Sequence, residues 1–177
     1  MSRFFAQVYG SWNGMQKEKI EKIMDHIGPG FMTDAVGKKI LDIGAGFGVL
    51  LDFMPNAISL EPDRKMLRVR KNFVLGRAEA APFKPGSFDV VFALDVLHLV
   101  RSNNWLECLK IGGTVIASVF CNNTNEKERL KMLGEKLAGC GIEEEFVIEG
   151  REREAVVVAR KITSSRARRS PAGPCTT

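Results

Sequence analysis

The sequence predicts an α/β fold built on a mostly parallel β-sheet, with helices on both faces. Short apolar runs alternate with amphipathic stretches along residues 39–120, as in successive strand–helix–strand units. A glycine-rich turn, Gly44-Ala45-Gly46-Phe47-Gly48, follows the first strand directly. Two predicted strands at 143–149 and 154–160 are so close in sequence that they must pair antiparallel, because a parallel crossover needs about a dozen residues. The expected class is a doubly wound sheet that ends in an antiparallel hairpin.

Each element follows from a local pattern. Apolar residues at helical spacing predict a first helix over 14–27, with Asn13 as its cap and Gly28-Pro29-Gly30 as its end. Leucines at similar spacing predict a helix over 126–138. Helical stretches are also expected between the parallel strands, at 48–54, 63–71 and 101–110. The parallel strands themselves are predicted at 39–43, 57–61, 72–76, 88–94 and 114–120.

Composition indicates one globular domain over 1–162, including an N-terminal helical segment at 1–30. No apolar run approaches the ~18–20 residues of a membrane span, so we expect a cytoplasmic protein without a membrane partner. The formal charge of +5 comes from the end of the chain, since residues 1–159 hold 21 basic and 21 acidic side chains. Residues 163–177 are expected to be a disordered basic tail. The four cysteines lack the spacing of a zinc site, and no metal is expected.

The most informative segment is the glycine turn and the acid that follows it. A dinucleotide fingerprint would place a glycine at position 49, but Val49 stands there and the pattern is Asp-x-Gly-x-Gly-x-Gly from Asp42. Glu61 ends the second predicted strand, 19 residues after Asp42. A carboxylate at that position can accept hydrogen bonds from both hydroxyls of a ribose. A glycine turn without a ligand is the alternative.

Five motifs in order resemble the class I S-adenosylmethionine-dependent methyltransferases, specifically the type 11 branch that includes quinone-biosynthesis enzymes. The motifs cover roughly residues 38–120 and are Leu41-Asp42-Ile43-Gly44-Ala45-Gly46-Phe47-Gly48, Leu60-Glu61-Pro62-Asp63, Gly76-Arg77-Ala78-Glu79-Ala80-Ala81-Pro82-Phe83, Ser87-Phe88-Asp89-Val90-Val91-Phe92 with Leu97-His98, and Leu109-Lys110-Ile111-Gly112-Gly113. The resemblance implies a Rossmann-like sheet of strand order 3-2-1-4-5-7-6, with the seventh strand antiparallel. It also implies S-adenosylmethionine as the cofactor.

Site residues carried over by the resemblance surround that cofactor. Gly44 and Gly46 would let the backbone approach its methionine part, and Asp42 would orient the loop and contact the amino group through water. Glu61 would bind the ribose. Two residues would contact the adenine, Pro62 by its ring and Ala78 by its backbone N–H, and the backbone of Leu94 would lie beside the amino-acid end. Arg77 departs from the family, in which an aspartate often contacts the adenine.

The resemblance leaves the chemical residues open. His98 and Asp95 follow the fourth strand and are the candidates for catalysis, although a histidine packed at a helix start is the commoner arrangement. Phe4, Phe5, Tyr9 and Trp12 form an aromatic cluster ahead of the first helix, where relatives often cover the cofactor. Tyr9 is the expected contact, and docking of the helix is the alternative role of these rings.

Only Cys121-Asn122-Asn123-Thr124-Asn125 separates the fifth strand from the next helix, where relatives insert tens of residues to build the acceptor pocket. The pocket must therefore be shallow, or be completed by the N-terminal segment or by a second copy in a homodimer. The leading hypothesis is methyl transfer to a small-molecule acceptor. The alternatives are a macromolecular methyltransferase acting on RNA or protein, suggested by the basic tail, and a cofactor-binding module with little catalysis.

Overall fold

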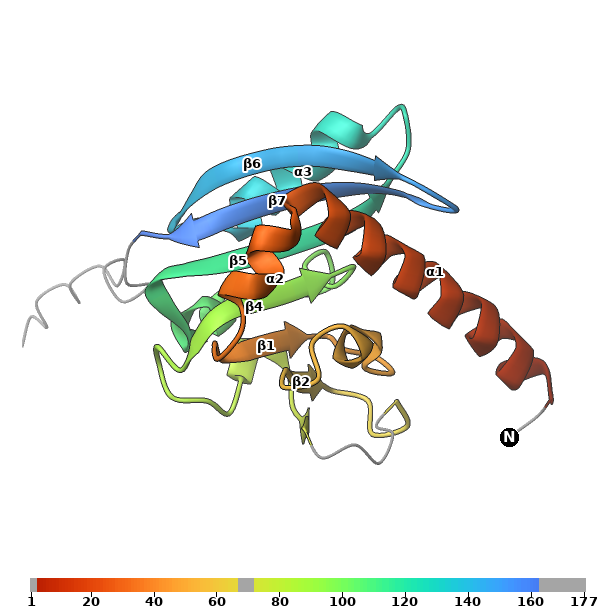
Figure 1. Cartoon of the computed structure of the whole chain (residues 1–177), viewed down its shortest axis with the longest axis horizontal. Coiled ribbons are helices and arrows are strands. Elements are labelled where there is room, and N and C mark those ends of the chain that lie inside the picture. The colour runs from red at the N-terminus through yellow and green to blue at the C-terminus, as the bar shows by residue number, and fades with distance from the viewer. Residues whose placement is uncertain (1–2, 67–71, 163–177) are drawn as a thin grey trace, which may run out of the picture.

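The computed structural model describes residues 3–66 and 72–162. Their centre is a seven-stranded sheet of order β3-β2-β1-β4-β5-β7-β6, in which only the pairs formed by β7 are antiparallel (Figure 1). This confirms the predicted fold class and strand order. The strands are β1 (Ile40–Ile43), β2 (Ile58–Glu61), β3 (Phe73–Leu75), β4 (Phe88–Leu94), β5 (Leu109–Cys121), β6 (Cys140–Glu149) and β7 (Arg153–Lys161).

The N-terminal helix is longer than its apolar pattern indicated. Helix α1 spans Arg3–Ile27, so Asn13 lies inside it and does not cap it. Helix α2 (Pro29–Asp34), which was not predicted, follows at once because Gly28 takes a positive φ of 84° and Pro29 can begin a new helix. Figure 1 shows α1 continuing past the arrowhead ends of the central strands. The open end of the parallel sheet is therefore next to the first half of α1.

The predicted helices at 48–54 and 101–110 were wrong in kind, because η1 (Val49–Asp52) and η3 (Asn104–Cys108) are short 3-10 helices. A third 3-10 helix, η2 (Ala78–Ala80), was not predicted. After β2 the chain makes a turn at 64–66, and the rest of the predicted helix lies outside the described residues. Helix α3 (Glu126–Lys136) forms nearly as predicted.

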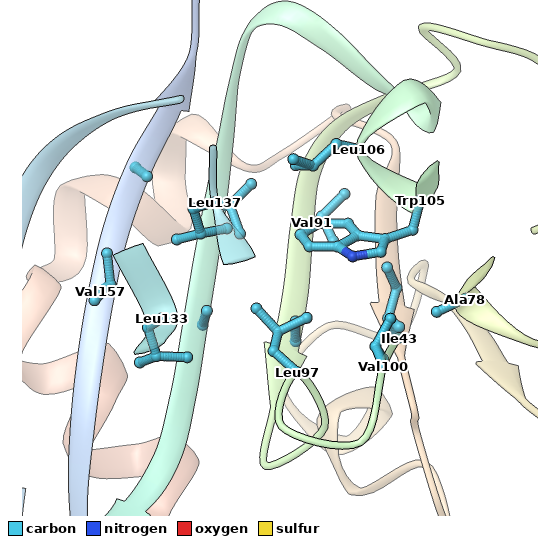
Figure 2. Close-up of a cluster of buried hydrophobic side chains, with 14 of the residues drawn as sticks. Ile43, Ala78, Val91, Leu97, Val100, Trp105, Leu106, Leu133, Leu137 and Val157 are labelled. Atoms are coloured by element: carbon cyan, nitrogen blue, oxygen red, sulfur yellow. The ribbon is translucent and has the colours of Figure 1, made fainter. Parts of the chain in front are cut away.

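Two apolar layers cover the sheet. On one face, Ile20 and Ile23 of α1 pack with Phe92 of β4 and Ile116 of β5. On the other, the core includes residues of α3, η3 and the strands, among them Leu133, Leu137, Trp105, Val91 and Val157 (Figure 2). Consecutive residues of β4 alternate between the layers, as expected for a sheet that is buried on both faces. Within the described ranges, no helix is long and apolar enough to cross a membrane. The predicted tail at 163–177 lies outside these ranges.

Candidate functional site

The glycine turn leaves β1 in a backbone conformation that side chains disfavour. Gly44, Gly46 and Gly48 have positive φ values of 68°, 53° and 70°. The N–H groups of Gly44 and Ala45 both donate to the carbonyl of Leu60, at 2.9 and 3.2 Å, which ties the turn to β2. A Cβ on Gly44 would lie 2.4 Å from Cγ2 of Val96. The turn therefore needs glycine at position 44 both for its conformation and for space.

Glu61 holds this turn from the end of β2. Its Oε2 accepts the N–H of Gly46 and its Oε1 accepts the N–H of Asp63, each at 2.9 Å. The residue is only 7% exposed. Each carboxylate oxygen has more than one lone pair, so both can accept a further hydrogen bond.

Asp42, in β1, is a second buried acid beside Glu61. It is 5% exposed, and none of the described residues donates a hydrogen bond to its carboxylate. Burial, together with the nearby charge of Glu61, raises the pKa of Asp42 to about 7. Within the described ranges no lysine or arginine forms an ion pair with either acid. The site thus contains two close acids to which the described part of the chain gives no cation.

The larger of two adjoining cavities lies over the ends of β1 and β2. It measures about 280 Å³ and is open to solvent on one side. Four of the predicted cofactor residues line it: Gly44, Glu61, Pro62 and Ala78. Its opposite wall is the segment after β4, from Asp95 to Val100, which includes the 69%-exposed side chain of Leu99.

The smaller cavity, of about 80 Å³, continues toward α1 and shares Gly44 and Asp95 with the larger one. The predicted residues Asp42 and Leu94 line it. Its remaining wall comes from α1, whose contributing residues were not predicted as site residues: Trp12, Gln16 and Ile20. Trp12 belonged to the predicted aromatic cluster, and the spacing of four residues along the helix was the signal that could have identified all three.

Three predicted residues are placed differently from the rest. Gly46 lines neither cavity, and a Cβ on it would face the ring of Trp12 at 3.5 Å. Tyr9 lies in α1, but its side chain is outside the described part of the structure. His98 is exposed and is absent from the lining of both cavities. The structure thus brings Asp95, and not His98, to the junction of the cavities.

Asp95 is fixed by a buried ionic cluster. Its backbone has a positive φ of 54°, its Oδ1 accepts the N–H of Phe120 at 2.9 Å, and its Oδ2 contacts the ammonium of Lys19 from α1. The Lys19 Nζ also lies 2.7 Å from Oε1 of Glu154 in β7 and 3.9 Å from Oε2 of Glu152. These contacts join α1 to the end of β4 and to the antiparallel strand.

Burial and the charges within this cluster shift the pKa values of Glu154 and Lys19. Burial, with the charge of Asp95, raises the pKa of Glu154 to about 7. Burial alone would lower the pKa of Lys19, but the charges of Asp95 and Glu154 outweigh it and raise that pKa. The Lys19 side chain is only 3% exposed, so the cation stays charged inside the fold by virtue of these partners.

Solved structures with the same fold are numerous, and all three described here are distant in sequence. A chain of the complex between the Trm112 methyltransferase activator of Haloferax volcanii and a partner classed as a methyltransferase has a TM-score of 0.59 and 14% identity, over 72% of this chain and 84% of that one. A SAM-dependent methyltransferase from Aquifex aeolicus has a TM-score of 0.56 and 15% identity, over 71% and 83%. The [4+2]-cyclase SpnF has a TM-score of 0.57 and 14% identity, over 71% and 75%. These likenesses establish the fold.

Sequence comparison gives the family. No curated protein sequence matches this chain significantly. Residues 41–117, which run from β1 into β5, match the type 11 family described as a methyltransferase domain. On that match residues 41–117 are a methyltransferase domain of the type 11 family, and this family implies S-adenosylmethionine as the cofactor.

Proposed function

We propose that this chain transfers the methyl group of S-adenosylmethionine to a small-molecule acceptor. The observation that carries the proposal is the junction of the two cavities, where Gly44 and Asp95 line both and α1 forms a wall of the smaller one. An acceptor that reaches this junction must pass α1 or the segment after β4. A compact molecule fits such an approach better than a nucleic acid or a folded protein does.

The residues around the larger cavity suit the adenosine part of the cofactor. The carboxylate of Glu61 retains acceptor capacity for ribose hydroxyls, although both its oxygens already accept backbone N–H groups. Pro62 and Ala78 line the same cavity and would contact the adenine. The volume of about 280 Å³ is near the lower end of the range for small-molecule sites.

The charges also suit this cofactor. S-adenosylmethionine carries an ammonium and a sulfonium, both positive. Asp42 and Glu61 are buried acids without a cation from the described residues, and the pKa of Asp42 is raised by its burial and, secondly, by the charge of Glu61. A bound cation would favour the ionised form of Asp42 and reduce the repulsion between the two acids.

The chain's part in the reaction is mainly to position the reactants and to exclude water. The bound cofactor would supply a methyl group on a good leaving group. Ile20 and Leu94 provide apolar walls near the junction, and Trp12 provides an aromatic one. Asp95 is held by Lys19 and by the N–H of Phe120, which makes it a positioning residue in this proposal. An acceptor atom with a free lone pair needs no general base.

Incubation with radiolabelled S-adenosylmethionine and separate pools of small molecules, RNA and protein tests the proposal. We expect label in the small-molecule pool, and loss of that label in the Glu61→Ala variant. Label in RNA or protein alone would overturn the choice of acceptor class. Cofactor binding without transfer to any pool would favour a binding module, and a cyclase with the same fold illustrates that this architecture serves other reactions.

A further inference from the structure

Gln16 is a buried polar side chain of α1 beside the smaller cavity. It lies on α1, is only 8% exposed, and forms no hydrogen bond with any of the described residues. Its side chain lines the smaller cavity. Buried polar groups in native proteins nearly always have a partner, and leaving one without a partner costs stability. The position of Gln16 therefore calls for a partner that occupies the cavity.

Asp42 lines the same cavity from β1, and its carboxylate likewise accepts no hydrogen bond from the described residues. The two groups differ in chemistry, because a carboxylate only accepts hydrogen bonds when ionised, whereas an amide has two N–H donors and a carbonyl acceptor. A ligand that bears an ammonium and a carboxylate would satisfy both groups. The amino-acid end of S-adenosylmethionine bears both.

The helix is anchored just after Gln16. Lys19 lies three residues further along the same face of α1, and its ammonium is buried against Asp95 and Glu154. Ile20, one turn after Gln16, packs into the core on that face of the sheet. These contacts place this part of α1 against the cavity that Gln16 lines.

We propose that the Gln16 amide donates a hydrogen bond to the carboxylate of the cofactor's amino-acid end, while Asp42 serves its ammonium. The inference rests on the proposed function and extends it, because it makes α1 a part of the cofactor site. Helix α1 would then recognise the amino-acid end of the cofactor, which is the part that differs most from an ordinary nucleoside.

Two ligands separate this contact from a general effect on the fold. S-adenosylhomocysteine has the amino-acid end, whereas 5′-methylthioadenosine has the same nucleoside and sulfur without it. In titration calorimetry we expect Gln16→Leu to bind S-adenosylhomocysteine about 10- to 100-fold more weakly, the range for a hydrogen bond to a charged group. Affinity for 5′-methylthioadenosine should stay unchanged and would show that the variant is folded.

Two further variants sharpen the result. Gln16→Glu should weaken the binding of S-adenosylhomocysteine at least as much as Gln16→Leu does, because the new carboxylate would repel the carboxylate of the ligand. Lys17→Leu, at the exposed neighbouring position, is the matched control and should bind both ligands normally. Equal loss of both ligands in Gln16→Leu, or no loss of either, would overturn the inference. A wild-type chain that binds neither ligand would instead refute the proposed function.

Discussion

Replacement of Asp42 by Asn should stabilise the ligand-free protein at high pH. Asp42 is 5% exposed, its carboxylate has no hydrogen-bond donor among the described residues, and Glu61 adds a second negative charge nearby. An asparagine has nearly the same size and no charge. The substitution therefore removes the electrostatic cost of ionising position 42 and leaves the packing of β1 in place.

The magnitude follows from the pKa of Asp42, which is about 7 in the folded chain and 3.8 for a solvent-exposed aspartate such as that of the unfolded chain. Between these values the folded state binds a proton that the unfolded state has lost, so the free energy of unfolding falls as pH rises. Each pKa unit corresponds to about 1.4 kcal/mol. From pH 5 to pH 8 the wild type should thus lose about 2 to 3 kcal/mol relative to Asp42→Asn.

Urea unfolding of both proteins at pH 5 and pH 8 measures this difference. Glu154 also has a pKa of about 7, but it is present in both proteins and its contribution cancels. Asp89→Asn is the control, since Lys110 and the N–H of Lys39 lower the pKa of Asp89 and its titration ends below this pH range. Parallel pH dependence in wild type and Asp42→Asn would refute the assignment of a raised pKa to Asp42.

The remaining predictions test the loop, the ionic cluster and the domain boundary. Glu61→Ala should lose cofactor binding and lower the melting temperature, because two backbone N–H groups lose an ionised acceptor worth about 1.5–3 kcal/mol each. Gly46→Val should cost about 1–3 kcal/mol of stability, measured by urea unfolding, since φ is 53° there. Lys19→Met should cost about 3–5 kcal/mol, whereas Lys17→Met should cost little. A chain ending at Ile162 should keep the melting temperature and cofactor affinity of the full chain, and a large loss of either would refute the proposed boundary.

The sheet could be predicted from the sequence because its signals are local. Strands such as β4 and β7 contain uninterrupted apolar runs, at 90–94 and 155–159, and the alternation of such runs with polar segments gave the strand positions to within a few residues. The hairpin of β6 and β7 followed from the short loop between them. The order of the strands came from the family's motifs, since no local pattern specifies which strands are neighbours.

The connections and α1 could not be predicted as well, for a physical reason. Apolar residues at 48–54 and 101–110 indicate burial, but both α-helical and 3-10 turns can bury them, so the apolar pattern does not distinguish the two. The early start of α1 was missed because its apolar face is clear only from Met15 onward. Tertiary packing decides such cases more than propensity does.

The residues of the candidate site also divide into those that the sequence could predict and those that it could not. Asp42, Gly44, Glu61 and Pro62 lie at strand ends, where the topology of a parallel sheet gathers them. Their proximity was therefore predictable. The contribution of α1 was not, because Lys19 meets Asp95 and Glu154 across a long separation in the chain, and nothing near Lys19 in sequence indicates an acidic partner.

The two groups of acids at this end of the sheet differ in the source of their cation. Asp95 and Glu154 share the ammonium of Lys19, so the chain itself offsets the cost of burying them. Asp42 and Glu61 receive no cation from the described residues, and Asp42 is raised in pKa as a result of its burial and of the charge of Glu61. A protein can retain such a pair of buried acids when a ligand supplies the missing positive charge, because ligand binding then offsets the free-energy cost of burying the two acids. In the proposed site the ligand would supply the cation on the Asp42 side, whereas Lys19 of α1 supplies it on the Asp95 side, so we expect the cofactor and α1 to stabilise the same junction from opposite directions.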